Sequence, residues 1–343
     1  MTPDAHNLLT HHCGDLRSMA PNWKKRGDFG LAQCYAEFEH LLRIAQVFRI
    51  PDAGRITGIA NPFAEFHKMM VEDEKLIRLP YPVTCVEFEP GNAYEKTVGD
   101  YTPKSLLATA IEGDLFRERM QKFAKPDYPA GAAMFMEAKI FVVCTHEFDG
   151  LARAHARASG YECRTSFPLT WHGLGFSAAY CERAGLMTQG GAPVGHGWLD
   201  QRSSRKYITG DELNALNQIG GEEHRECFAI VDLLLALSCS NVTISRLPSA
   251  LSESAKRRRE AKGKPKFYDY HILEITGASD RAEGSGESHA SPRLHLRRGH
   301  IRRLHDSGRR IWVNACVVGK PESGVLLKDY DARPLSISMG AIT

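Results

Sequence analysis

The feature that most restricts how this chain can fold is a basic run, residues 293–310, that is too highly charged to be buried. These eighteen residues contain seven arginines and three histidines with one acid, Asp306. Apolar residues are spaced among the basic ones, and a β-branched and aromatic run follows at residues 311–313. Between the two runs, Asp306, Ser307 and Gly308 have the composition of a turn. The segment therefore predicts a basic β-hairpin on the surface.

A second basic segment precedes it at residues 256–266, with seven basic residues and one acid, a net charge of +6. Residues 293–310 also sum to +6, so the rest of the chain carries −9 of the total of +3. Basic charge concentrated on an acidic body is typical of a polyanion-binding surface. The residues expected to form it are Lys256, Arg257, Arg258, Arg259, Lys262, Lys264, Arg293, Arg297, Arg298, His300, Arg302, Arg303, Arg309, Arg310 and Trp312.

The apolar patterns predict an α+β fold, with a helical N-terminal part packed on a mixed or antiparallel sheet and a C-terminal basic β-hairpin. Helical periodicity covers residues 31–50, and a second helix begins with Asn61 as N-cap and Pro62 in its first turn. Strands are expected at residues 83–88, 138–144, 267–275 and 324–330, and helices at 101–122, 222–238 and 250–261. The basic residues of 250–261 point in several directions, so that helix is expected to be largely exposed.

Four regions follow from these patterns: a helical N-terminal region (1–76), an α/β central region with Gly-rich loops (77–210), a C-terminal helix plus a basic β-meander (211–335) and a poorly ordered tail (336–343). No segment reaches the roughly 18 apolar residues of a membrane span, and the first residues lack a secretory signal, so we expect a cytoplasmic protein. The nine scattered cysteines are expected to be free thiols. No cofactor and no metal is expected, and His11 and His12 are interpreted as solvent-exposed.

From residue 237 onward the chain resembles a C-terminal module of proteins encoded by bacteriophages, prophages and related mobile elements. The matching residues are Asn241 after Ser238-Cys239-Ser240, the basic linker 256–265, the strand 270–275, His295, Arg297-Arg298-Gly299-His300, Arg302, Gly308, Trp312-Val313, Gly319 and Lys328-Asp329-Tyr330. Residues 79–87 also look like the N-terminal part of such proteins. The resemblance implies the cytoplasm of a bacterial host cell as the setting, and it implies no catalytic residues.

Three functions remain open at this stage. The main prediction is a nucleic-acid-binding protein, DNA or RNA, because arginines bind phosphate and Tyr268, Tyr270 and Trp312 could stack on bases. One alternative is a metal-independent ribonuclease or toxin-like enzyme in which His295 and His300 act as acid and base beside the arginines, with Tyr330 as a further candidate. The other alternative is a phage-encoded inhibitor that binds a host protein with an acidic surface.

Overall fold

The computed structural model describes most of the chain between residues 7 and 325. The described ranges are 7–25, 27–50, 55–57, 59, 61–72, 77–88, 103–126, 129–148, 170–183, 195–198, 224–249, 251–275, 293–297, 300–305, 307–313, 316–318 and 320–325. The predicted tail at 336–343, the strand residues 326–330 and most of the Gly-rich loops lie outside these ranges.

The fold is built on one mixed sheet of eight strands in the order β6-β5-β4-β3-β2-β1-β8-β7. Its strands are β1 (Gln46–Arg49), β2 (Val83–Phe88), β3 (Pro103–Glu112), β4 (Ile140–Phe148), β5 (Thr170–Leu174), β6 (Gly195–Trp198), β7 (Val242–Leu247) and β8 (Tyr270–Ile275). β1 pairs in parallel with both β2 and β8, and the other neighbours pair antiparallel. The predicted α+β class is thus confirmed, and the sheet takes strands from all three of the regions expected from the sequence.

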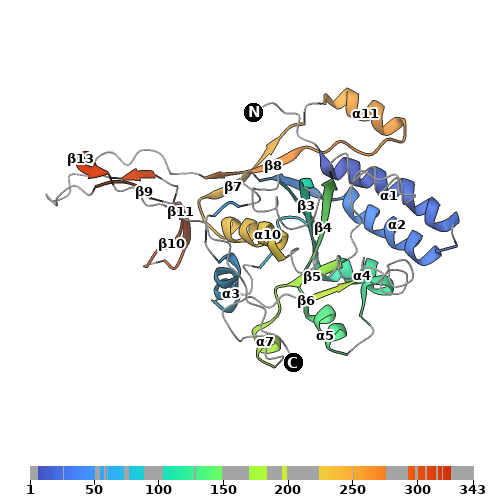
Figure 1. The fold of residues 1–343 in the computed structure, drawn as a ribbon, viewed down its shortest axis with the longest axis horizontal. Coiled ribbons are helices and arrows are strands. Elements are labelled where there is room, and N and C mark those ends of the chain that lie inside the picture. The colour runs from blue at the N-terminus through green and yellow to red at the C-terminus, as the bar shows by residue number, and fades with distance from the viewer. Residues whose placement is uncertain are drawn as a thin grey trace.

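Helices lie on both sides of this sheet (Figure 1). They are α1 (Leu8–Lys25), α2 (Phe29–Arg43), α3 (Pro62–Glu72), α4 (Gly113–Ala124), α5 (Pro129–Glu137), α7 (Ala178–Arg183), α10 (His224–Leu237) and α11 (Glu253–Ala261). In Figure 1, α1 and α2 lie on one side of β3 and β4 and α10 lies on the other. All six residues of β2 are buried, as expected of a central strand covered on both faces. No helix in the described ranges is long and apolar enough to cross a membrane.

Local signals located some elements correctly. α3 begins at Pro62, and the side chain of Asn61 accepts a hydrogen bond from the Ala64 N–H at 3.1 Å, so the predicted N-cap is confirmed. The strand at 83–88, the strand beginning near 138 and the helix ending near 238 are also present, as β2, β4 and α10. In each case the residues at the boundary indicate where the element starts or stops.

Two predicted helices were wrong in part. The helix expected over 31–50 ends at Arg43, and Val47 and Phe48 instead lie buried in β1 between two parallel neighbours. The helix expected over 101–122 begins only at Gly113, because residues 103–112 form β3 and pair with β2 and β4. Both stretches have compatible helical spacing, and pairing with strands distant in sequence decides their structure.

The C-terminal strands form two small sheets. The hairpin consists of β10 (His300–Arg303) and β11 (Arg310–Val313), which pair antiparallel. β9 (Arg293–Arg297) pairs instead with β12 (Cys316–Val318) and β13 (Lys320–Val325). The basic hairpin is therefore confirmed, but its expected first strand is divided near residue 298 between two sheets.

One predicted environment was wrong. His12 is fully buried in α1, with its Nε2 atom 3.2 Å from Thr145 Oγ1, and burial lowers the pKa of His12 to about 3. It is a core residue and not a solvent-exposed one. Six of the cysteines are buried thiols of the described core and are not in disulfides, as expected: Cys13, Cys34, Cys85, Cys144, Cys227 and Cys239.

Candidate interaction surfaces

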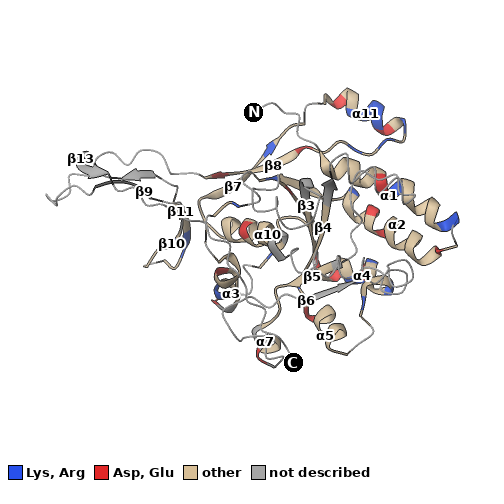
Figure 2. Ribbon diagram, in the orientation of Figure 1, with Lys and Arg blue, Asp and Glu red and all other residues tan. Residues whose placement is uncertain are grey.

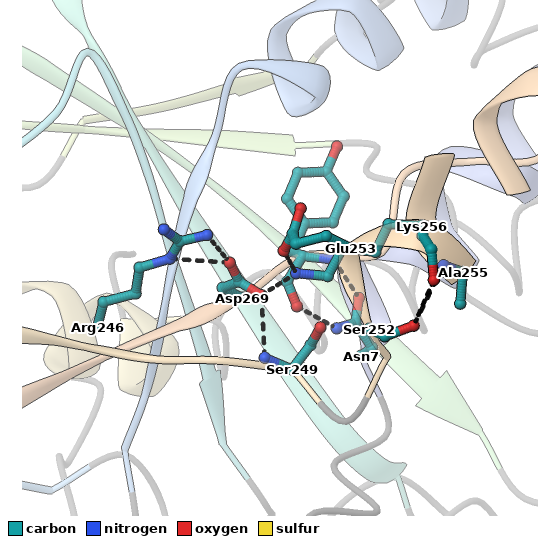
Figure 3. A network of polar contacts seen from close by, with 10 residues as sticks. Asn7, Arg246, Ser249, Ser252, Glu253, Ala255, Lys256 and Asp269 are labelled. Carbon is teal, nitrogen blue, oxygen red and sulfur yellow. Dashed lines mark hydrogen bonds and ion pairs between the residues drawn. The ribbon is translucent and has the colours of Figure 1, made fainter. Parts of the chain in front are cut away.

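The basic helix α11 is attached to the body through one buried lysine. Lys256 is 8% exposed, and its ammonium lies 2.5 Å from Asp269 Oδ1 and 2.8 Å from Glu253 Oε1 (Figure 3). Asp269 precedes β8 and also accepts hydrogen bonds from the Ser249 N–H at 2.9 Å and from Arg246 Nε at 2.8 Å. One carboxylate therefore connects the start of β8, the end of β7 and α11.

This network stabilises the charged forms of its members. Partial burial opposes ionisation of Asp269, but hydrogen bonds from Lys256, the Ser249 N–H and Arg246 outweigh it and hold the pKa of that carboxyl well below its usual range. Burial likewise acts to lower the pKa of Lys256, and the hydrogen bonds to Asp269 and Glu253 outweigh it, so this pKa is raised. Lys256 thus remains charged, and its ammonium group is paired with two carboxylates of the protein itself.

The two ends of α11 are also defined. Ser252 caps its start, accepting a hydrogen bond from the Ala255 N–H at 3.3 Å, and Gly263 follows its end with a φ of +68°. Beyond it the chain lies against α1: Arg17 donates to the Gly263 carbonyl at 3.2 Å, and Thr10 donates to the Lys266 carbonyl at 2.7 Å. Anchors at the start, middle and end hold α11 in one orientation.

The outward face of α11, defined here as Ser254, Arg257, Arg258, Ala261 and Lys262, points away from Lys256. A helix turns about 100° per residue, which places Ser254, Arg258 and Ala261 roughly opposite the buried lysine, with Arg257 and the C-cap residue Lys262 about 100° and 120° to its two sides. All five are exposed, and three of them are cations. Figure 2 shows the basic colouring along α11, with acidic positions near its two ends. In the described part of the chain, no carboxylate forms an ion pair with these three cations.

The β10–β11 hairpin is anchored differently, by the turn that precedes β7. The side-chain amide of Asn241 donates to the Trp312 carbonyl at 2.9 Å and accepts from the Trp312 N–H at 2.7 Å. Beside it, the Ser240 N–H donates to the Arg310 carbonyl at 2.9 Å. The Asn241 amide thus pairs with β11 as a peptide group of a neighbouring strand would. Trp312 is 7% exposed and packs inward.

The two arginines that flank the turn of the hairpin share one acid. Arg303 and Arg310 lie directly opposite each other across the two strands, an arrangement that repels. Glu72, at the end of α3, accepts a hydrogen bond from Arg303 at 2.8 Å on one carboxylate oxygen and from Arg310 at 2.7 Å on the other. This carboxylate removes the repulsion and ties the hairpin to α3.

The structure does not bring the two basic segments together. Figure 1 places α11 beside α1 and the β10–β11 hairpin at another end of the molecule, beside α3. The expected stacking surfaces are buried, since Tyr268, Tyr270 and Trp312 are each less than 8% exposed. Of the predicted contact residues, Arg257, Arg258, Lys262 and Lys264 are exposed near α11, and Arg302, Arg303 and Arg309 on the hairpin. The prediction of one shared basic surface was wrong.

Of the other predicted binding and catalytic residues, one makes contacts within the protein, and the side chains of the rest are outside the described part of the structure. Arg259 donates to the Pro265 carbonyl at 2.8 Å and lies over the ring of Phe267. For Arg293, Arg297, His295 and His300 only the backbone is described, and Arg298 and Tyr330 lie outside the described residues. The two catalytic candidates His295 and His300 belong to different sheets, in β9 and β10, so the structure does not pair them. Within the described ranges, no cluster of three or more metal-binding side chains occurs.

Two of the residues that position these surfaces, Asp269 and Glu72, were not identified from the sequence. Asn241 was named there only among the residues of the resemblance, with no role assigned. A signal existed for Asp269, which is the only acid between Lys262 and Glu274 in an otherwise basic and apolar stretch. For Glu72 no local signal exists, because its partner Arg303 is 231 residues away in sequence.

Comparison with known proteins yields one match. A family model described as AcrVA2-like, the anti-CRISPR type V subtype A2 family, matches residues 70–320 of the 343-residue chain. The match spans α11 and the β10–β11 hairpin. No curated protein and no solved structure matches the chain.

This match corrects the main functional prediction. An anti-CRISPR family is phage-encoded, so the phage setting expected from the resemblance is confirmed, although the motif that suggested it stays a prediction. Nucleic-acid binding as the function was wrong. The match favours the alternative of a phage-encoded inhibitor that binds a host protein.

Proposed function

Because the chain belongs to the AcrVA2-like family of type V subtype A2 anti-CRISPR proteins, we propose that it inhibits a type V CRISPR-Cas system of the host by binding a host protein. The observation that carries this proposal is the extent of the family match, which covers seven of the eight strands of the main sheet. Both basic surfaces fall within the matched range. Inhibition by binding requires an exposed, well-positioned surface and no catalytic centre.

The physical features of α11 support a binding role. It is a helix held in one orientation by a buried lysine and two defined ends, so little backbone freedom is lost when a partner binds. Charged groups arranged in this way raise association rates and select partners of opposite charge.

The test is an interference assay in bacteria that carry a type V CRISPR-Cas system targeting a plasmid. Expression of the chain should restore plasmid transformation, whereas a truncated chain ending before β7 should not, because it lacks β8 and cannot complete the sheet. A strain whose CRISPR array lacks the matching spacer serves as the control for general toxicity. Full interference in the presence of soluble wild-type chain would refute the proposal.

A further inference from the structure

Resting on the proposed function, we propose that the outward face of α11 is the docking surface for an acidic segment of the host protein partner. The face presents Arg257, Arg258 and Lys262 around the small residue Ala261. A small residue among three cations allows a partner backbone to approach closely while its carboxylates reach the guanidinium and ammonium groups.

In the described part of the chain no carboxylate pairs with the cations of this face; the Arg258 guanidinium donates to the Ser254 carbonyl at 3.4 Å, and cations at the end of a helix complement its dipole. Arg258 and Lys262 are one helical turn apart, and like charges at this spacing destabilise a helix by roughly 0.2–0.5 kcal/mol. The carboxylates of α11, Glu253 and Glu260, lie toward the side of Lys256 and Arg257, and leave Arg258 and Lys262 without an acid three or four residues away. Sheet-edge protection, which explains charged edge strands, does not apply to a helix.

The hairpin provides the contrasting case. The two arginines that flank its turn both pair with Glu72, and its remaining exposed cations lie on a two-stranded hairpin, where charge prevents unwanted strand pairing. The cations of the hairpin are therefore explained by the fold. Arg258 and Lys262 on α11 have no carboxylate partner in the described residues, and in this proposal the host protein supplies the opposite charge.

An acidic protein segment fits this face better than a nucleic acid does. Single-stranded nucleic acid is held by aromatic stacking along a continuous basic groove. Tyr268 and Tyr270 are buried, and Phe267 is covered by the Arg259 guanidinium. Glu253 and Glu260 on the flanks of α11 would repel a phosphate backbone that continued past the face. The basic face of α11 is only as long as the helix and has Glu253 and Glu260 beside it. A face of this size can pair with a short run of carboxylates on a partner protein.

The experiment compares two variants that change net charge equally, Arg258→Glu with Lys262→Glu on α11 and Arg302→Glu with Arg309→Glu on the hairpin. Binding of poly-L-glutamate, and of a single-stranded oligonucleotide as the competing class, is measured by fluorescence anisotropy across a salt series. The neutral pair Arg258→Gln with Lys262→Gln is made as well, because glutamate near a helix C-terminus can destabilise the helix. Circular dichroism confirms that each variant is folded.

We expect the α11 variants to lose about tenfold in polyglutamate affinity, and the hairpin variant to lose less than about twofold. Equal losses in the two, or oligonucleotide binding that is tighter than polyglutamate binding and depends on α11, would overturn the inference. The same variants are then used in the plasmid assay. Inhibition retained by a folded α11 variant overturns the docking surface and leaves the proposed function intact. Failure of the wild type to inhibit overturns the proposed function, and the binding data alone then decide the inference.

Discussion

Residues 256–266 and 293–310 carry the same net charge of +6 in the sequence, but the fold uses the two segments differently. In the first, one lysine is buried against Asp269, and Arg257, Arg258 and Lys262 are exposed without acidic partners in the described residues. In the second, a carboxylate from α3 bridges the two opposed arginines and Asn241 fixes the strand behind them. The difference teaches that the pairing of charges, and not their number, indicates which basic segment is available to a partner.

The largest effect is expected from Lys256→Met, which tests whether α11 is held by its buried ion pair. Removing the ammonium leaves Asp269 without a buried partner and should lower the free energy of unfolding by about 3 kcal/mol. Lys262→Met is the matched control on the exposed side, and it should change stability by less than about 0.5 kcal/mol. Urea unfolding measures both. Equal stability of the two variants would contradict the anchoring role of Lys256.

The hairpin should depend on Asn241 in the same way. Asn241→Ala leaves the buried N–H and carbonyl of Trp312 unpaired, at a cost of about 2 kcal/mol. Hydrogen exchange should accelerate over residues 300–313 and stay unchanged over 251–275, whereas the nearby control Thr243→Ser should leave both segments protected. Accelerated exchange over both segments would show that the two regions are not anchored independently.

Acid should affect the α11 side of the molecule through His12. The folded pKa of about 3 lies below the ordinary value of 6.5, so the unfolded chain binds the extra proton between these values. Stability is therefore lost as pH falls from 6.5 toward 3, by up to about 1.4 kcal/mol per pH unit for this group. Urea unfolding at pH 7, 6 and 5 should show a shallower loss for His12→Gln than for the wild type. Parallel pH profiles would rule out His12 as the titrating group.

The smallest effect is expected from Glu72→Gln. The ion pairs of Glu72 are partly exposed, so their loss should cost at most about 1 kcal/mol. Arg303 and Arg310 then face each other without a carboxylate, which makes the hairpin more basic. We expect plasmid inhibition to be unchanged, with Glu65→Gln on the same helix as the control. A gain or loss of inhibition would show that the hairpin also contacts the partner.

The sequence was sufficient for elements whose boundaries are marked by local chemistry. Asn61 with Pro62 specified the start of α3, and the turn at Gly308, with a φ of +64°, specified the hairpin. It was insufficient for β1 and β3, whose residues have spacing compatible with a helix and become strands because they pair with partners distant in sequence. Such pairing is a property of the whole chain and leaves no local mark.

The candidate surfaces show the same division. The two runs of positive charge were evident in the sequence, and the exposed position of α11 followed from the distribution of cations around the helix. The acids that neutralise them were not evident, because Asp269 lies in the next strand segment and Glu72 lies in the N-terminal half. The single basic surface expected from the sequence is therefore two surfaces. In one of them, the hairpin, two arginines are paired with Glu72 of the protein itself.

The most direct test of this account is site-specific photo-crosslinking in bacteria that carry the type V system. A photoreactive phenylalanine analogue is placed at position 261, at the centre of the outward face of α11, or at position 307, in the hairpin turn. We expect the chain labelled at 261 to cross-link to a protein of the CRISPR-Cas system through a segment rich in Asp and Glu, and the chain labelled at 307 to give no such product. Cross-linking from 307 and not from 261 would contradict the assignment of α11 as the surface that binds the host partner.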